Sequence, residues 1–152
     1  MDPLKDVKRF HELFGLPVLD SPAMPDRARC ELRVALIQEE LDELSQAIKD
    51  NDLVEVADAL ADLQYVLSGA VLEFGMAGKF PALFSEVHRS NMSKTCKTEE
   101  ERDATMKHYL EDRGVDTYWV RKDGEYLVKR SSDSKGLKSV GYSPADLRTI
   151  LE

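Results

Sequence analysis

Two short acidic stretches, Glu39-Glu40-Leu41-Asp42-Glu43 and Glu55-Val56-Ala57-Asp58, decide the fold of this 152-residue chain. When 31–49 and 52–74 are wound as helices, Glu39, Glu40 and Glu43 lie on one stripe of the first helix. Glu55 and Asp58 lie on one stripe of the second, because positions i, i+3 and i+7 share a face. Asp62 extends the second stripe by one turn. The first helix has apolar residues on two sides and the second is apolar nearly all round, so the pattern predicts two packed helices whose acids enter the interior.

Carboxylates gathered in an apolar interior need a compensating positive charge, because an unpaired buried charge is costly and like charges repel. Between Arg33 and Lys79 the chain offers only Lys49. A divalent cation is therefore expected, and ligands that are all carboxylates suit Mg²⁺ or Mn²⁺ better than zinc. The alternative is an exposed acidic groove that binds nothing.

Turn and capping signals predict the remaining elements. Asp50-Asn51-Asp52 ends one acidic helix and caps the next, which predicts an antiparallel hairpin with a very short turn. Further helices are expected at 3–14, 80–92, about 98–112 and after the cap Ser143-Pro144-Ala145-Asp146, and a β-hairpin at 117–129 around Asp123-Gly124. The expected fold class is mainly α, an antiparallel helical bundle with a small C-terminal β-hairpin.

Composition limits the class of protein. The length and a hydrophobic content of 42% suit a single domain, 1–152, with a helical metal-binding core at 1–112 and a hairpin and C-terminal extension at 113–152. A net charge of −8 disfavours a nucleic-acid partner. No apolar stretch reaches the length of a membrane span, so we expect no membrane partner and a cytoplasmic protein.

Four smaller expectations concern histidine, cysteine and glycine. His11 is expected to be a solvated helix residue rather than a catalytic one. Cys30 and Cys96 lack zinc spacing and are expected to be free thiols. The segment 75–79 lacks the spacing of a P-loop. No histidine follows a glutamate by three residues, which argues against a di-iron bundle.

The densest basic stretch near the helices is His88-Arg89-Ser90-Asn91-Met92-Ser93-Lys94. Arg89 and Lys94 can offer charge-assisted hydrogen bonds to phosphate. Asn91 has the donor and acceptor that suit a polar ring edge. A solvated helix end, with its cations complementing the helix dipole, is the alternative.

The acidic pair on consecutive helices resembles the all-α nucleoside triphosphate pyrophosphohydrolase superfamily. Its MazG-like and phosphoribosyl-ATP pyrophosphohydrolase-like members are also similar to this chain in other segments. These segments are Phe14-Gly15-Leu16-Pro17, Asp58-Ala59-Leu60-Ala61-Asp62, 86–94 and the tail from Lys138 to Leu147. The specific part of the resemblance lies within 7–94.

The resemblance implies metal-dependent hydrolysis of a nucleoside or deoxynucleoside triphosphate, (d)NTP, to the monophosphate and pyrophosphate. It implies Mg²⁺, or Mn²⁺ in its place, as the cofactor. Glu40, Glu43, Glu55 and Asp58 would be the metal ligands, with Asp62 as a further ligand or a neighbour of the ligands. Glu39 would ligate another metal or act as the catalytic base.

Substrate contacts and partners complete the expectation. Arg89, Asn91 and Lys94 are expected to bind the nucleoside triphosphate. Relatives dimerise and a bundle this small leaves apolar surface uncovered, so a homodimer or a dimer of dimers is expected. Three alternatives stay open: a phosphoribosyl-ATP pyrophosphohydrolase, an enzyme selective for dUTP or dCTP, and a non-enzymatic helical dimerisation module.

Overall fold

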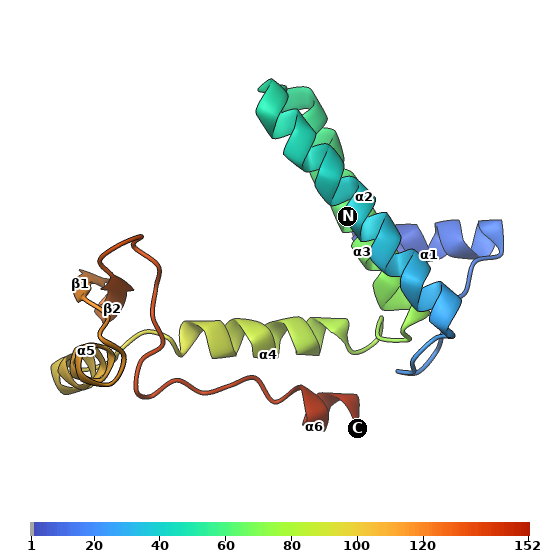
Figure 1. Ribbon diagram of the computed structural model, residues 1–152. Helices are drawn as coiled ribbons and strands as arrows, with labels where there is room; N and C mark the ends of the chain where they lie inside the picture. Colours follow the sequence, from blue (N-terminus) through green and yellow to red (C-terminus); the bar gives the residue numbers. More distant parts are fainter. Residues whose placement is uncertain (1) are drawn as a thin grey trace. The chain divides into compact units, whose positions relative to one another are not determined.

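The structure is a computed structural model that describes residues 2–152. In these residues the chain forms six helices and one antiparallel pair of strands (Figure 1). The elements are α1 Pro3–Phe14, α2 Arg27–Asp50, α3 Leu53–Glu73, α4 Phe80–Met92, α5 Glu99–Arg113, β1 Thr117–Lys122, β2 Glu125–Arg130 and α6 Leu147–Leu151. The mainly helical fold class expected from the sequence is confirmed.

The contacts divide the chain into two compact units, Met1–Pro81 and Ala82–Glu152. The division falls within α4, whereas the sequence suggested an internal boundary at 112/113 of a single domain. Within residues 2–152, no helix is both long and apolar enough to cross a membrane. Each unit is described by itself below.

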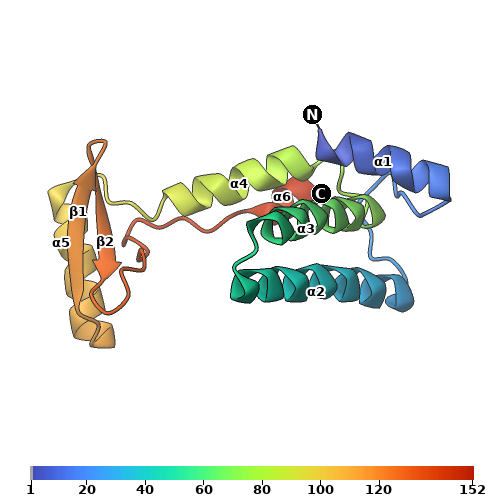
Figure 2. The same cartoon turned by 90° about the horizontal axis from the view of Figure 1, so that it is seen from above.

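In the first unit, α2 and α3 form the expected antiparallel hairpin and lie side by side in both views (Figures 1 and 2). Asn51 adopts a left-handed conformation, with φ of 54°, and ends α2. The side chain of Asp52 accepts hydrogen bonds from the N–H groups of Val54 and Glu55 and so caps α3. The short turn therefore holds the two acidic helices next to each other.

A buried ion-pair network joins the other end of the hairpin. Glu73 of α3 is 1% exposed, and Arg29 and Arg33 of α2 both donate hydrogen bonds to its carboxylate. Burial alone would raise the pKa of Glu73, but the bonds from the two guanidinium groups outweigh it and lower that pKa. Gly69 leaves room for this network, since a Cβ there would lie 2.6 Å from Nη1 of Arg33.

His11 is part of this interior, so the expectation that it is solvated is wrong. It is 2% exposed because α1 packs on α3, and its Nδ1 lies 3.0 Å from the carbonyl oxygen of Pro17. The following loop is fastened to the end of α3 by backbone bonds from Leu19 to Leu72 and from Ala23 to Phe74. The N-terminal segment thus closes one end of the α2–α3 hairpin.

The prediction that the acids of α2 and α3 enter the interior is also wrong for the single chain. Leu53, Val54 and Ile48 are 79%, 75% and 62% exposed. Within this unit, α1 and the following loop cover only part of α3. Apolar side chains on the uncovered faces of α2 and α3 therefore remain exposed. The acids are correspondingly accessible: Glu39, Glu43, Glu55 and Asp58 are exposed, and Glu40 and Asp62 are half-buried.

In the second unit, α5 packs against the predicted β-hairpin (Figures 1 and 2). Asp123 and Gly124 both have positive φ, 52° and 84°, as a tight two-residue hairpin turn requires. Tyr126 and Val128 of β2 are buried with Cys96. Both cysteines are free thiols, as expected.

The chain after β2 returns along α5 and α4 of the second unit. Ser139 is buried, and its hydroxyl donates to the carbonyl oxygen of Ser93 at 3.1 Å. The last helix, α6, is capped by Asp146, which accepts from the N–H of Thr149. The expected cap at Ser143 is wrong, because Ser143 instead donates its N–H to the hydroxyl of Ser93.

The Glu73 network allows a first prediction. Glu73→Gln keeps the shape of the side chain but leaves the buried guanidinium group of Arg33 and the half-buried one of Arg29 without their counter-charge, so the free energy of unfolding should fall by roughly 3–5 kcal/mol. Urea unfolding followed by circular dichroism measures this change. Glu31→Gln, which breaks the exposed pair with Arg27, is the matched control and should cost less than about 1 kcal/mol. Equal effects of the two substitutions would contradict the importance of the network.

Candidate active site

Acids of α2 and α3 lie near enough to one another to interact electrostatically. The half-buried carboxyl of Glu40 on α2 has a raised pKa, first because of its partial burial and then because of the negative charges of Asp62, Glu43, Glu39 and Asp58. Asp62 acts most strongly among these neighbours. Acids of both helices therefore act on one carboxyl group, and their mutual repulsion is not compensated.

The remaining predicted ligand, Glu55, lies in the capped first turn of α3 and is exposed. Within residues 2–152, no three side chains of His, Cys, Asp and Glu come close enough together to hold a metal ion. Exposed carboxylates that repel one another spread into solvent, which accounts for this arrangement. The donor set consists only of carboxylate oxygens, and this chemistry fits Mg²⁺ or Mn²⁺.

The predicted substrate contacts belong to the second unit. Arg89 donates from Nε and Nη2 to the carboxylate of Glu86, both at 2.8 Å, and from Nη2 to the carbonyl oxygen of Pro144 at 2.9 Å. Its guanidinium group thus holds the C-terminal tail. Lys94 donates to Oδ1 of the exposed Asn91 at 2.7 Å, so these two side chains lie together at the C-terminal end of α4.

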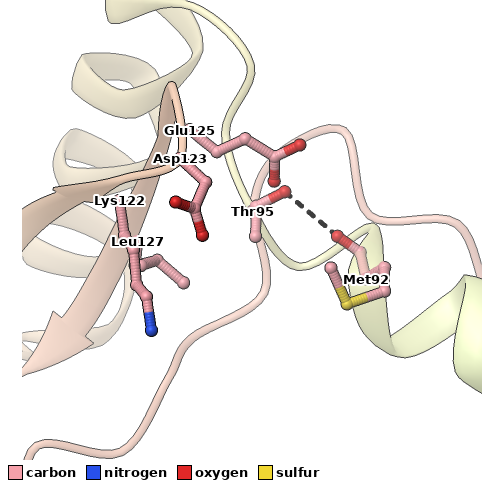
Figure 3. Close-up of a pocket in the computed structure, with 6 residues that line it drawn as sticks. All are labelled: Met92, Thr95, Lys122, Asp123, Glu125 and Leu127. Carbon is pink, nitrogen blue, oxygen red and sulfur yellow. Dashed lines mark hydrogen bonds between the residues drawn. The ribbon is translucent and has the colours of Figure 1, made fainter.

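The second unit contains a cavity of about 270 Å³ (Figure 3). Two of its lining residues, Met92 and Thr95, are the sequence neighbours of Asn91 and Lys94. Its lining combines the end of α4 with the β-hairpin: Met92, Thr95, Lys122, Asp123, Glu125 and Leu127. The hydroxyl of Thr95 donates to the carbonyl oxygen of Met92 at 3.0 Å. The sequence did not predict a site at these residues, because only the fold brings the hairpin turn to the end of α4.

Comparison with protein families assigns the chain to a family. Residues 7–91 match the family described as phosphoribosyl-ATP pyrophosphohydrolase, and the match covers more than half of the chain. The match places the protein in the all-α NTP pyrophosphohydrolase (MazG-like) superfamily, as the resemblance predicted. Within that superfamily, the chain belongs to the phosphoribosyl-ATP pyrophosphohydrolase family. The comparison with curated proteins found no match.

Membership of this family identifies a pyrophosphohydrolase, a hydrolase that acts on acid anhydrides. The matched region contains the six acids predicted to form the site, together with Arg89 and Asn91. The six acids are Glu39, Glu40, Glu43, Glu55, Asp58 and Asp62. Lys94, α5, the β-hairpin and the tail lie outside the match. The part of the chain that carries the family identity is thus the part that carries the acidic stripes.

The carboxyl group of Glu86 allows a test by pH. The hydrogen bond from Arg89, and then the bond from the N–H of Asp146, lower its pKa from 4.5 to about 2. Because the pKa is depressed in the folded protein, the stabilising contribution is complete above about pH 4.5 and is lost as the pH falls through about 2. A carboxyl ¹³C NMR titration should find a midpoint near pH 2 for Glu86.

Hydrogen exchange of α6 gives a second readout of the same contact. In Glu86→Gln, the N–H groups of residues 146–151 should exchange faster at pH 6, because the anchoring carboxylate is gone. Glu111→Gln, which removes an exposed partner of Lys107, serves as the control and should leave exchange in α6 unchanged. A midpoint near 4.5 for Glu86 in the titration would show that the contact with Arg89 does not persist in solution.

Proposed function

We propose that this protein is a metal-dependent nucleoside triphosphate pyrophosphohydrolase that converts a (d)NTP to the monophosphate and pyrophosphate. The observation that carries the proposal is the position of Glu40, half-buried among acids of α2 and α3 that raise its pKa. The family provides the reaction class, and the acidic pair provides a place where a polyphosphate can be held through divalent cations.

The proposed ligands are Glu40 and Glu43 of α2 with Glu55 and Asp58 of α3. Asp62 joins them, since its charge acts most strongly on Glu40 among the neighbouring carboxylates. Mg²⁺, when bound, would supply Lewis acidity toward the phosphate oxygens and relieve the repulsion between the carboxylates. Mn²⁺ has the same preference for oxygen ligands and should replace it.

The reaction proposed is direct attack of water on phosphorus with cleavage of the α–β phosphoanhydride bond. Glu39, exposed beside Glu40, would accept the proton of the attacking water. The electrons of the broken P–O bond leave on pyrophosphate. The carboxylates of the stripes are proposed as metal ligands and as the base rather than as nucleophiles, so we propose no phosphorylated enzyme intermediate.

Substrate selection is proposed to involve Lys94 and Asn91. The ammonium group of Lys94 suits phosphate oxygens of any nucleotide, whereas the amide of Asn91 can distinguish bases by their donors and acceptors. Arg89 is proposed to act mainly by fixing the tail, since its guanidinium group already binds Glu86 and Pro144. The family description makes phosphoribosyl-ATP a second candidate substrate, with the same bond cleaved.

We further propose that the exposed apolar face of α2 and α3 is covered by a second copy of the chain. Leu53, Val54 and Ile48 would otherwise remain in water, which is unfavourable by about 25 cal/mol per Å² of apolar surface. Light scattering should then give about twice the chain mass of 17.2 kDa, or a higher multiple. Leu53→Glu should shift the mass toward one chain, and a wild-type mass of one chain would contradict the proposal.

The proposed activity is tested by a panel of nucleotides that includes phosphoribosyl-ATP, assayed for pyrophosphate release with Mg²⁺. Asp58→Asn and Glu43→Gln should each reduce turnover by about 100-fold or more, because each removes a ligand charge while keeping the shape. Both should also lose the rise in Tm that Mn²⁺ gives the wild-type protein. In the same panel, Lys94→Ala should weaken all substrates similarly, while Asn91→Ala should change their ranking.

Asp42→Asn is the matched control, since Asp42 is an exposed acid of α2 that accepts a hydrogen bond from Gln38. It should leave turnover unchanged. Hydrolysis in ¹⁸O-water then shows by mass spectrometry which product carries the new oxygen. Release of a nucleoside diphosphate with orthophosphate would refute the proposed bond. Absence of both metal stabilisation and hydrolysis would favour the non-enzymatic dimerisation module.

A further inference from the structure

A second concave site lies wholly within the second unit, outside the family match. A cavity of about 320 Å³ opens between the end of α5 and the returning tail. Its lining contains three basic side chains and no acidic one: His108, Arg113, Lys138, Ser139, Val140 and Tyr142. Such a lining favours a negatively charged occupant.

The two permanent charges in this cavity are not neutralised by the protein. Among the described residues 2–152, the ion pairs include neither Arg113 nor Lys138. Arg113 lies over the ring of Tyr109, with Cζ 5.7 Å from the centroid, and Lys138 lies over Tyr142, with Nζ at 4.2 Å. Their charges therefore remain available to an anion, whereas His108 already contacts Asp112 at 2.6 Å.

Hydrogen bonds fix the backbone that carries Lys138 and Tyr142. The N–H of Lys138 donates to the hydroxyl of Tyr109 at 3.2 Å. The N–H of Val140 donates to the hydroxyl of Thr105 at 3.0 Å. A segment held in this way needs little further ordering when a ligand arrives, which favours binding.

The hydroxyl of Tyr142 adds a neutral donor. Ser90 donates to this oxygen at 3.2 Å, so the proton of Tyr142 itself is free to be donated to a ligand. An arginine fork, an ammonium group and a phenolic donor together match the several acceptor oxygens of a phosphate group.

The charge of the unit argues for a small anion rather than a nucleic acid. Residues 82–152 contain 13 Lys and Arg and 13 Asp and Glu, so the unit as a whole is neutral. A nucleic-acid surface needs basic residues spread along a face. The cavity instead brings two cations, Arg113 and Lys138, together in one concavity.

We propose that the cavity formed by Arg113, Lys138 and Tyr142 binds a phosphate-bearing small anion, such as pyrophosphate, without a metal. The site is separate from the carboxylates of α2 and α3, and it does not depend on the proposed activity. Inorganic pyrophosphate is the probe, titrated into the full chain after a chelator has been used to remove metals and has been dialysed away. Calorimetry should show one binding event per chain, weakened by added salt.

Arg113→Gln and Lys138→Gln should each weaken this binding by about tenfold, because each removes a charge-assisted hydrogen bond. Lys107→Gln, on the same helix but paired with Glu111, should bind like the wild type. Asp58→Asn should also bind like the wild type, which distinguishes this site from the proposed catalytic one. In wild-type protein, the backbone NMR shifts caused by pyrophosphate should centre on residues 108–113 and 138–142, so the test stands even if a variant fails to fold.

The proposal is overturned if metal-free wild-type protein shows no binding at millimolar pyrophosphate. Equal affinity of the wild type and the Arg113→Gln and Lys138→Gln variants would overturn it as well. Loss of binding in Asp58→Asn would assign the pyrophosphate to the acidic helices instead.

Discussion

The first unit depends on one buried carboxylate, that of Glu73, enclosed by the guanidinium groups of Arg29 and Arg33. The Asn51 turn fixes one end of the α2–α3 hairpin, but a turn alone does not set how two long helices lie along their full length. A charge pair buried at the opposite end does so, because any sliding of α3 against α2 would leave a charge unpaired in the interior. The relation between Glu40 on α2 and Asp58 and Asp62 on α3 follows from these two fixed ends.

Stability and proposed function make opposite demands on charge in this hairpin. Around Glu73 the charges compensate one another, and the pKa of the carboxyl is lowered. Around Glu40 they do not, and the pKa is raised by burial and by the neighbouring acids. Carboxylates that repel one another without a counter-charge are typical of sites where a ligand supplies the missing charge.

The sequence predicted what local chemistry determines. The bounds of α4, the Asp52 cap and the Asp123-Gly124 turn follow from proline, glycine and aspartate signals and agree with the structure. The burial of His11 was not predicted, because it depends on how α1 packs on α3. The use of Arg89 to hold Pro144 was missed for the same reason, since 55 residues separate these partners. The acids were chosen as candidate site residues from their spacing on two helices. Their exposure was not predicted, because helical periodicity does not tell which apolar faces the chain itself covers.

The partition of charge between the two units has a further consequence. Since residues 82–152 are neutral, the first unit, with 8 Lys and Arg against 16 Asp and Glu, carries the entire net charge of −8. In solution an atmosphere of counter-cations surrounds such a surface, and added salt shortens the range of its field. A free polyphosphate is repelled by this unit at long range, whereas one that travels with its own cations is not. The ionic composition of the medium therefore governs how often a phosphate-bearing molecule reaches the acidic helices.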